Sequence, residues 1–279
     1  MTGRETPARH LDWERVGWHG GLAAVTALLL GPVIVAVLAS FKTSDSLYDS
    51  NPLPTHFTLD NYATATDRFP IVHLLMNTLA TSAGVMAAQL AVATLAAYAV
   101  VRFDTRIARV VLAAGALSIV VPVQAFLIPQ FLAISNLGWV NTYAGLIVPQ
   151  LSGAGVALLL LHQHVRAIPD SLTEAAHLDG ASSWQTLWHI VLPLLRPSLL
   201  AVGILVFINT WNEYLWPLLS APGQSHGTIQ TGLALFGNTE GANPGPLLAA
   251  ATLATLPVLV CYLFAARRVT DAFMHAGIH

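Results

Sequence analysis

Charged side chains are scarce in this chain. Asp, Glu, Lys and Arg make up 9% of its 279 residues, whereas hydrophobic residues make up 55%. With a mean hydropathy of +0.63, the composition is too apolar and too poor in charge for a water-soluble domain. The net charge is only -2, so no overall basic field attracts nucleic acid. The composition predicts an integral membrane protein and excludes a nucleic-acid-binding protein.

Cysteine and lysine are almost absent. The single cysteine, Cys261, lies in an apolar run, which excludes an intramolecular disulfide framework and a metal site built from cysteines. The single lysine, Lys42, follows Phe41, so the chain has no Gly-Lys-Ser/Thr phosphate-binding loop. If the protein uses ATP, the nucleotide and its Mg²⁺ must bind to another chain. We expect no cofactor in this one.

The histidines also lack metal-binding spacing. The closest pair, His162 and His164, are two residues apart and would not share a helix face, and no His-Glu-x-x-His motif occurs. We therefore expect no metal site and no catalytic residue. An intramembrane enzyme, which would need a set of polar residues inside its spans, is the least favoured function class.

Long apolar runs are what the chain has in abundance. Six stretches approach or exceed the roughly 20 residues that cross a bilayer, and they cover residues 18–41, 71–101, 107–135, 143–162, 197–219 and 246–266. The first run is longer than the apolar region of a signal peptide, so a retained anchor is favoured. The chain is predicted to be an all-α integral membrane protein with six transmembrane helices in a single domain, residues 1–279.

Lys and Arg are unevenly distributed between the loops. If both termini are cytoplasmic, the outer segments hold Lys42 and Arg68, and the inner segments hold Arg4, Arg9, Arg15, Arg102, Arg106, Arg109, Arg166, Arg196, Arg267 and Arg268. An excess of positive charge in the cytoplasm is the usual orientation signal. The distribution predicts a multi-pass protein of the cytoplasmic membrane, with a cytoplasmic N-terminal segment 1–17. Loops 42–70 and 220–245 would face an external partner.

The cytoplasmic loop 163–195 contains several helix signals. Ser171 and Glu174 have the spacing of a capping box, which predicts the start of a short helix. Asp179-Gly180 is predicted to end this helix, because glycine accepts a left-handed backbone. Ser182 and Gln185 have the spacing of a second capping box.

The same loop is predicted to end in prolines. Pro193 and Pro197 should close the second helix before the fifth span. Ala175 and Ala176 keep one face of the first helix slim enough for close packing. The predicted product is a pair of short helices with a small-residue tip, a shape that suits a groove in another protein.

The segment Glu174-Ala175-Ala176-His177-Leu178-Asp179-Gly180, followed after nine residues by Ile190-Val191-Leu192-Pro193, resembles the EAA loop of ABC importer permeases. Considered alone, Glu174 has a second interpretation, in which it only caps its own helix. Further stretches resemble the second permease subunit of carbohydrate-type importers, a family that includes glycerol-3-phosphate importers. They are residues 57–62, 76–78, 122–129, 137–147, 179–182 and 211–218.

This resemblance implies a type I ABC importer permease fold, with a transport core in residues 71–266 that faces a related permease and a first span that packs around that partner. It also implies two cytoplasmic ATPase subunits, which bind ATP and Mg²⁺, and an external substrate-binding protein. The residues it assigns to ATPase coupling are Glu174, Ala175, Ala176, Asp179, Gly180, Leu192 and Pro193. The C-terminal segment 271–279 departs from the Gly-rich basic tail of many relatives.

Glu213 is the only carboxylate within the predicted spans. An ionisable group in a span usually faces the bundle interior or water. Its neighbours Asn209, Trp211, Asn212 and Tyr214 offer amides and rings that suit a hydroxyl-rich solute. The alternative is a polar cap within an interfacial aromatic belt. No Lys or Arg lies in the interior of a predicted span, so this chain supplies no fixed cation for a phosphate group inside the membrane, which favours a neutral sugar as the solute.

One other function class remains open for a protein of this composition. A channel or secondary transporter would work without ATP and without an EAA segment. Dependence of transport on ATP separates this class from the importer.

Overall fold

The chain folds into helices and the turns between them. The computed structural model describes residues 13–276 with gaps at 50, 52, 104, 224 and 241–243, and no strand occurs in this part. The α-helices are α1 (Trp13–Ala39), α2 (Asp60–Arg68), α3 (Ile71–Arg102), α4 (Arg106–Val120), α5 (Leu127–Asn136), α6 (Tyr143–Ile147), α7 (Ala154–Arg166), α8 (Asp170–Leu178), α9 (Ser183–Thr186), α10 (Leu192–Trp211), α11 (Leu215–Ser220), α12 (Ile229–Glu240) and α13 (Gly245–Ala276). Most of the N-terminal segment 1–17 and residues 277–279 of the tail lie outside the described residues.

Five of these helical stretches are long and apolar enough to cross a membrane. They are Gly17–Ala39, Ile71–Arg102, Tyr143–Arg166, Ser183–Trp211 and Gly245–Leu263. A sixth crossing is counted only if the bent pair Arg106–Val120 and Val123–Asn136 forms one span. The number of membrane helices predicted from the sequence is therefore at the upper limit of what the structure contains.

The predicted third span, residues 107–135, is not one helix. Its two halves meet at an angle of 101°. Pro122 explains the break, because it has no amide hydrogen to donate and it forces the preceding residue into an extended conformation. Val121 has this conformation, with ψ of 122°. The second half starts as a 3₁₀ turn, η2 (Val123–Phe126), and continues as α5.

The predicted fifth span, residues 197–219, is misplaced along the chain. Helix continues from Ser183 through Pro193 and Pro197 to Trp211, so the prediction that the two prolines end a helix was wrong. The turn before Pro193 is a π-helical segment, η4 (Leu187–Val191). Such a wide turn changes which carbonyl faces each amide, which lets a helix continue past a missing donor.

Two apolar clusters hold the helices together. One joins α3, α7, η4 and α10 around Leu161, Leu187 and Leu195. The other joins α2, α3, α10, α12 and α13 around Leu74 and Trp211. α3 and α10 contribute to both clusters, so these two helices connect the two ends of the molecule.

α4 approaches α7 through glycine. A side-chain carbon at Gly155 would collide with the Ser118 hydroxyl and would lie 2.7 Å from the Gly115 carbonyl. Small residues allow this close helix contact in a membrane, where packing rather than water exclusion drives association.

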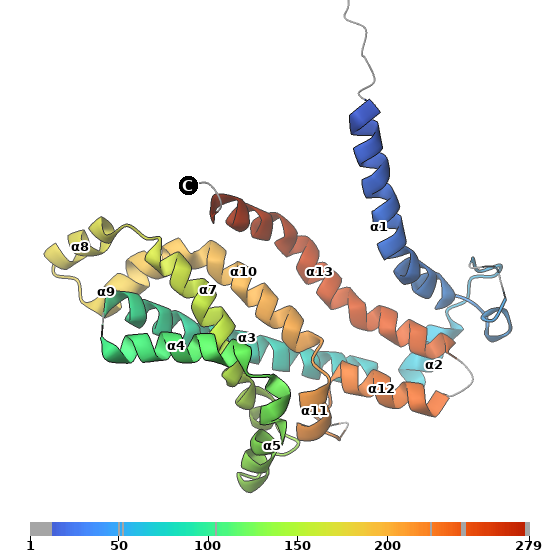
Figure 1. Cartoon of the computed structure of the whole chain (residues 1–279). Coiled ribbons are helices and arrows are strands. Elements are labelled where there is room, and N and C mark those ends of the chain that lie inside the picture. Colours follow the sequence, from blue (N-terminus) through green and yellow to red (C-terminus); the bar gives the residue numbers. More distant parts are fainter. Residues whose placement is uncertain are drawn as a thin grey trace, which may run out of the picture.

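α1 projects away from the rest of the chain (Figure 1). None of its apolar span is buried within this molecule. Its leucine and valine side chains must therefore contact lipid or another protein.

Candidate functional site

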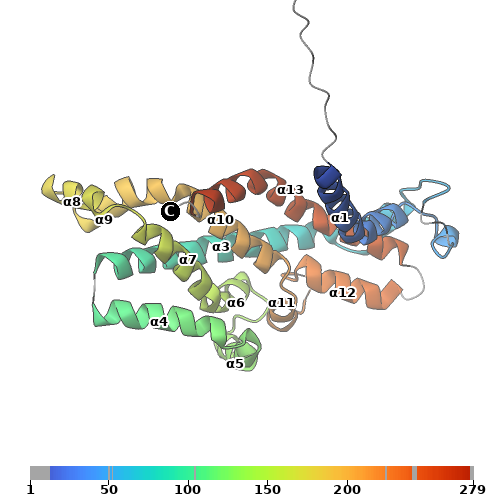
Figure 2. The same cartoon turned by 45° about the horizontal axis from the view of Figure 1, so that its top comes forward.

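α8 protrudes at one end of the long helices, and α2, α11 and α12 lie toward the other end (Figures 1 and 2). α8 begins at Asp170, directly after Pro169, and no side chain caps its first turn. The predicted capping box of Ser171 and Glu174 is therefore absent, because both residues already lie inside the helix. No hydrogen bond joins the Glu174 side chain to the first turn of α8, so the interpretation that it only caps its own helix was wrong. The residue is exposed.

The end of α8 matches the prediction. Gly180 has φ of +80°, and its amide donates to the His177 carbonyl at 3.1 Å. The Ala181 amide donates to the Ala176 carbonyl at 2.9 Å. These two bonds form a Schellman motif, which satisfies carbonyls that the helix end would otherwise leave unpaired. The tip of the loop therefore has a defined shape.

The capping box of the next helix is confirmed. The Ser182 hydroxyl accepts from the Gln185 amide at 3.3 Å, and the Gln185 side-chain oxygen accepts from the Ser182 amide at 2.8 Å. Each bond spans only three residues, which is why local sequence was sufficient to predict it.

The predicted coupling residues do not all lie on the protruding loop. Glu174, Ala175, Asp179 and Gly180 are exposed there, while Ala176 is buried. Leu192 and Pro193 are half-buried at the start of α10, and Leu192 packs against an apolar cluster. We therefore restrict the candidate docking surface to α8 and Gly180.

Leu178 is a candidate that the sequence interpretation missed. Its side chain is 90% exposed at the end of α8. An apolar residue directly before Asp179-Gly180 was a usable signal, because a helix terminus that protrudes from the fold cannot bury it. An exposed leucine at the tip of a protruding loop suits insertion into a partner's groove.

The second candidate site is a cavity of about 410 Å³, within the range of small-molecule sites. Four elements enclose it: the middle of α3, the η2–α5 segment, the region from η3 (Pro149–Gly153) to α7, and the junction of α10 with α11. It is lined by Gln89, Val123, Gln124, Leu127, Gln130, Gln150, Ser152, Gly153, Val156, Ala157, Leu160, Val202, Leu205, Val206, Asn209, Thr210, Glu213, Leu215 and Trp216.

The cavity includes only two of the five predicted path residues, Asn209 and Glu213. Trp211 is 1% exposed and its indole donates to the Ala254 carbonyl at 3.3 Å, so it belongs to the apolar core. The Asn212 amide donates to the Ile208 carbonyl of its own helix at 2.8 Å. Neither Asn212 nor Tyr214 lines the cavity.

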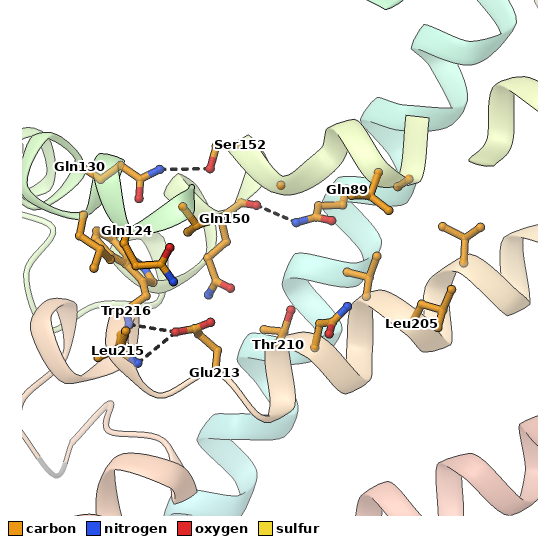
Figure 3. Close-up of a pocket in the computed structure, with 18 of the residues that line it drawn as sticks. Gln89, Gln124, Gln130, Gln150, Ser152, Leu205, Thr210, Glu213, Leu215 and Trp216 are labelled. Atoms are coloured by element: carbon orange, nitrogen blue, oxygen red, sulfur yellow. Dashed lines mark hydrogen bonds between the residues drawn. The ribbon is translucent and has the colours of Figure 1, made fainter. Parts of the chain in front are cut away.

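Glu213 lies between two helices and not inside one. α10 ends at Trp211 and α11 begins at Leu215. One carboxylate oxygen accepts from the Leu215 amide at 3.0 Å and the Trp216 amide at 3.3 Å, as Figure 3 shows. The predicted position within a continuous fifth helix was therefore wrong. The carboxylate replaces the acceptors that the first turn of α11 lacks.

Four glutamines of the cavity were not predicted: Gln89, Gln124, Gln130 and Gln150. Three of them lie within two residues of a proline in the sequence. That proximity was a usable signal, because a proline in a span leaves carbonyls unpaired and a nearby amide can pair with them.

A serine motif also escaped the sequence interpretation. Residues 223–227 read Gly-Gln-Ser-His-Gly, the Gly-x-Ser-x-Gly pattern of nucleophile elbows, which requires a turn between a strand and a helix. Ser225 instead lies in a loop without a strand, where its hydroxyl accepts from the Asn141 amide at 2.9 Å. No described carboxylate bonds the adjacent His226 ring. The pattern is structural here.

Residues 80–273 match the family model of the binding-protein-dependent transport system inner membrane component. The chain belongs to this family. The match extends from the first third of α3 into α13 and includes both candidate sites, but not α1. This inner membrane component is therefore a permease subunit of an ABC importer.

Individual relatives of this permease agree with the family. It is 32% identical to the sn-glycerol-3-phosphate transport system permease protein UgpE of Yersinia pestis, over 71% of each chain. It is 31% identical to the trehalose/maltose transport system permease protein MalG of Thermococcus litoralis, over 87% of this chain and 89% of that one.

A solved structure shows that the fold is shared. A chain of a bacterial ABC transporter involved in the import of the acidic polysaccharide alginate superposes with a TM-score of 0.79 at 22% identity, over 94% of this permease and 99% of that chain. The predicted all-α importer permease fold is confirmed.

Proposed function

We propose that this permease moves a sugar or polyol-type solute through the cavity between α3, α5, α7 and α10. The solute would be a di- or oligosaccharide, glycerol 3-phosphate or a glycerophosphodiester. The observation that supports this proposal is the cavity, whose mainly apolar lining carries polar side chains such as Gln124 and Glu213. It opens among the same helices that carry the protruding α8. A displacement of α8 would be transmitted to the cavity through α3 and α10.

The proposed partners are a second permease, two ATPase subunits and an external binding protein. The unburied apolar span of α1 gives the second permease a surface to cover. ATP and Mg²⁺ would bind to the ATPases, so this chain would have no catalytic role of its own. Residues 71–266 would form the transport core, and the ATPases would dock on the exposed part of loop 163–195.

ATP dependence tests this function. We expect proteoliposomes that contain the whole complex to take up solute only when ATP and Mg²⁺ reach the ATPases. A non-hydrolysable ATP analogue is the matched control. Uptake that continues with the analogue would contradict an ATP-driven importer and favour a channel or secondary transporter.

The proposed orientation places both termini and α8 in the cytoplasm. We expect Ser183→Cys, in a background where Cys261→Ala removes the native thiol, to react with thiol reagents only from the cytoplasmic side. Ser225→Cys, in the exposed loop before α12, should react only from outside. Labelling of Ser183→Cys by an impermeant external reagent in intact cells would overturn this orientation.

Tyr98 is a proposed positioning residue between α8 and the transport core. Its hydroxyl donates to the Ser183 carbonyl at 2.9 Å, while Gln89, nine residues earlier on α3, lines the cavity. We expect Tyr98→Phe to lower the solute imported per ATP hydrolysed about two- to tenfold, the effect of one hydrogen bond. ATPase association should be retained.

The matched control is Tyr62→Phe, which removes a hydroxyl bonded to Ser40 at 2.7 Å, far from α8. It should leave the ratio of import to hydrolysis unchanged. An unchanged ratio in Tyr98→Phe would show that this hydrogen bond has no part in coupling.

A further inference from the structure

The glutamine side chains of the cavity have fixed orientations. The amide nitrogens of Gln89, Gln130 and Gln150 donate to the backbone carbonyls of Gln150 at 2.6 Å, Pro149 at 3.3 Å and Leu146 at 2.8 Å, respectively. A carbonyl oxygen only accepts hydrogen bonds, so each glutamine must turn its nitrogen toward the backbone. All three bonds surround the helix break at Pro149.

This arrangement leaves the side-chain amide oxygens available to accept hydrogen bonds in the cavity. No hydrogen bond with another described residue engages the side-chain oxygens of Gln89, Gln130 or Gln150. The Glu213 carboxylate adds further lone pairs, because its two bonds go to one oxygen. Gln124, Gln150 and Glu213 approach the same region from η2, η3 and the α10–α11 junction (Figure 3). The part of the wall around Pro149 and Glu213 is therefore rich in hydrogen-bond acceptors, whereas the amides of Gln124 and Asn209 offer donors as well as acceptors.

The described part of the cavity wall carries only negative charge. Glu213 is the only charged side chain among the described residues that line the cavity, and no Lys, Arg or His joins it. A phosphate or carboxylate group brings acceptors and negative charge, so it would meet unpaired acceptors and a like charge. A hydroxyl-rich neutral solute brings donors that these oxygens can accept.

We propose that this acceptor wall binds a neutral, hydroxyl-rich glycoside or polyol and excludes solutes that carry phosphate or carboxylate. The apolar part of the lining, including Val123, Leu127 and Leu205, provides contact for the C–H faces of sugar rings. This inference rests on the proposed path and narrows its range of solutes. The acceptor oxygens select solutes with many hydroxyl groups, and the negative charge of Glu213 repels anionic solutes.

The charge of the cavity has a direct test that does not depend on the binding protein. In the assembled complex with Cys261→Ala, Gln124→Cys is treated with methanethiosulfonate reagents that carry either trimethylammonium or sulfonate. Gln124 suits this test because no described residue bonds its side-chain amide. The matched control is Asn136→Cys, at the end of α5 that is farther along the chain from Gln124 and outside the cavity lining.

We expect the ratio of cationic to anionic reaction rates to be about tenfold higher at Gln124→Cys than at Asn136→Cys, the effect of one nearby carboxylate. Adding Glu213→Gln should bring the two ratios together. Equal ratios before that change, or faster reaction of the sulfonate reagent in the cavity, would overturn the proposal.

Transport tests the same inference with solutes. We expect ATP-dependent uptake of a neutral disaccharide such as maltose, cellobiose or diacetylchitobiose to exceed that of glycerol 3-phosphate and of a galacturonate disaccharide at least about tenfold. Gln124→Leu should lower uptake about three- to tenfold, and Asn136→Leu should not. Preferred uptake of an anion would overturn the neutral class and leave the path intact. Uptake that ignores ATP would contradict the proposed function instead.

Discussion

We expect Gly180→Trp to abolish ATP-driven uptake while the permease still inserts into the membrane. Gly180 has φ of +80° and ends the exposed helix α8. A side chain there would meet nothing within 4 Å in this chain, so the large effect must come from the partner surface. Tryptophan would hold the ATPase away from α8, and its left-handed backbone adds a local cost of about 1–2 kcal/mol. If the free energy of association between the permease and the ATPase falls by about 3 kcal/mol, binding of the ATPase weakens about a hundredfold.

Two controls separate shape from backbone strain. Gly180→Asn keeps a small residue that accepts the left-handed conformation, so we expect most of the uptake to remain. Gly138→Trp introduces the same strain at φ of +69°, also with nothing within 4 Å, but two residues after the end of α5 and not at the end of α8. ATPase association should survive this change.

The measurements are co-purification of the ATPase and stimulation of ATP hydrolysis by solute-loaded binding protein. Glu174→Lys and a bulky residue at Ala175 should give the same loss as Gly180→Trp, because both positions are exposed on α8. Normal stimulated hydrolysis in Gly180→Trp would refute α8 as the coupling element.

We expect Glu213→Ala to lower uptake about ten- to a hundredfold. The change removes the acceptor of the Leu215 and Trp216 amides and the only charge among the described cavity residues. The bond to the Leu215 amide is exposed and the bond to the Trp216 amide is part-buried. A hydrogen bond contributes about 0.5–1.5 kcal/mol, so the start of α11 should be held less firmly at the cavity. Capture of solute by the external binding protein should not change, because capture takes place on another chain.

Glu213→Gln is the matched variant for this test. Its side-chain oxygen still accepts from the two amides, so uptake should fall less than in Glu213→Ala. Rates of solute uptake by the reconstituted complex, at equal amounts of assembled protein, provide the comparison. Unaltered uptake in Glu213→Ala would return this residue to its interpretation as an interfacial polar cap.

Helix breaks show where prediction from the sequence succeeds and where it fails. Gly180 and Ser182 were placed correctly because their hydrogen bonds link residues three to five positions apart. The effects of the prolines on the helices were predicted less accurately. Pro122 breaks its predicted span, whereas Pro193 and Pro197 lie within continuous helix. Neighbouring helices and local widening of the turn decide whether the freed carbonyls find other partners.

The cavity shows the same limit for side chains. Trp211 and Glu213 are two residues apart, yet one packs in the core and the other lines the cavity. A helix that continued past Trp211, as predicted, would have placed the neighbours of Glu213 differently. The end of α10 after Trp211 sets which side chains face inward.

The sequence by itself determined that this protein lies in a membrane, where four of its apolar spanning helices lie, and that a defined helix end occurs at Gly180. Transfer of apolar side chains out of water and short-range backbone hydrogen bonds are properties of single segments. Only the tertiary structure decided that Gln89 and Gln150, 61 positions apart, bond across the cavity. It also decided that Trp211 packs in the apolar core and does not line the predicted substrate path. The direction of a side chain depends on packing between distant helices.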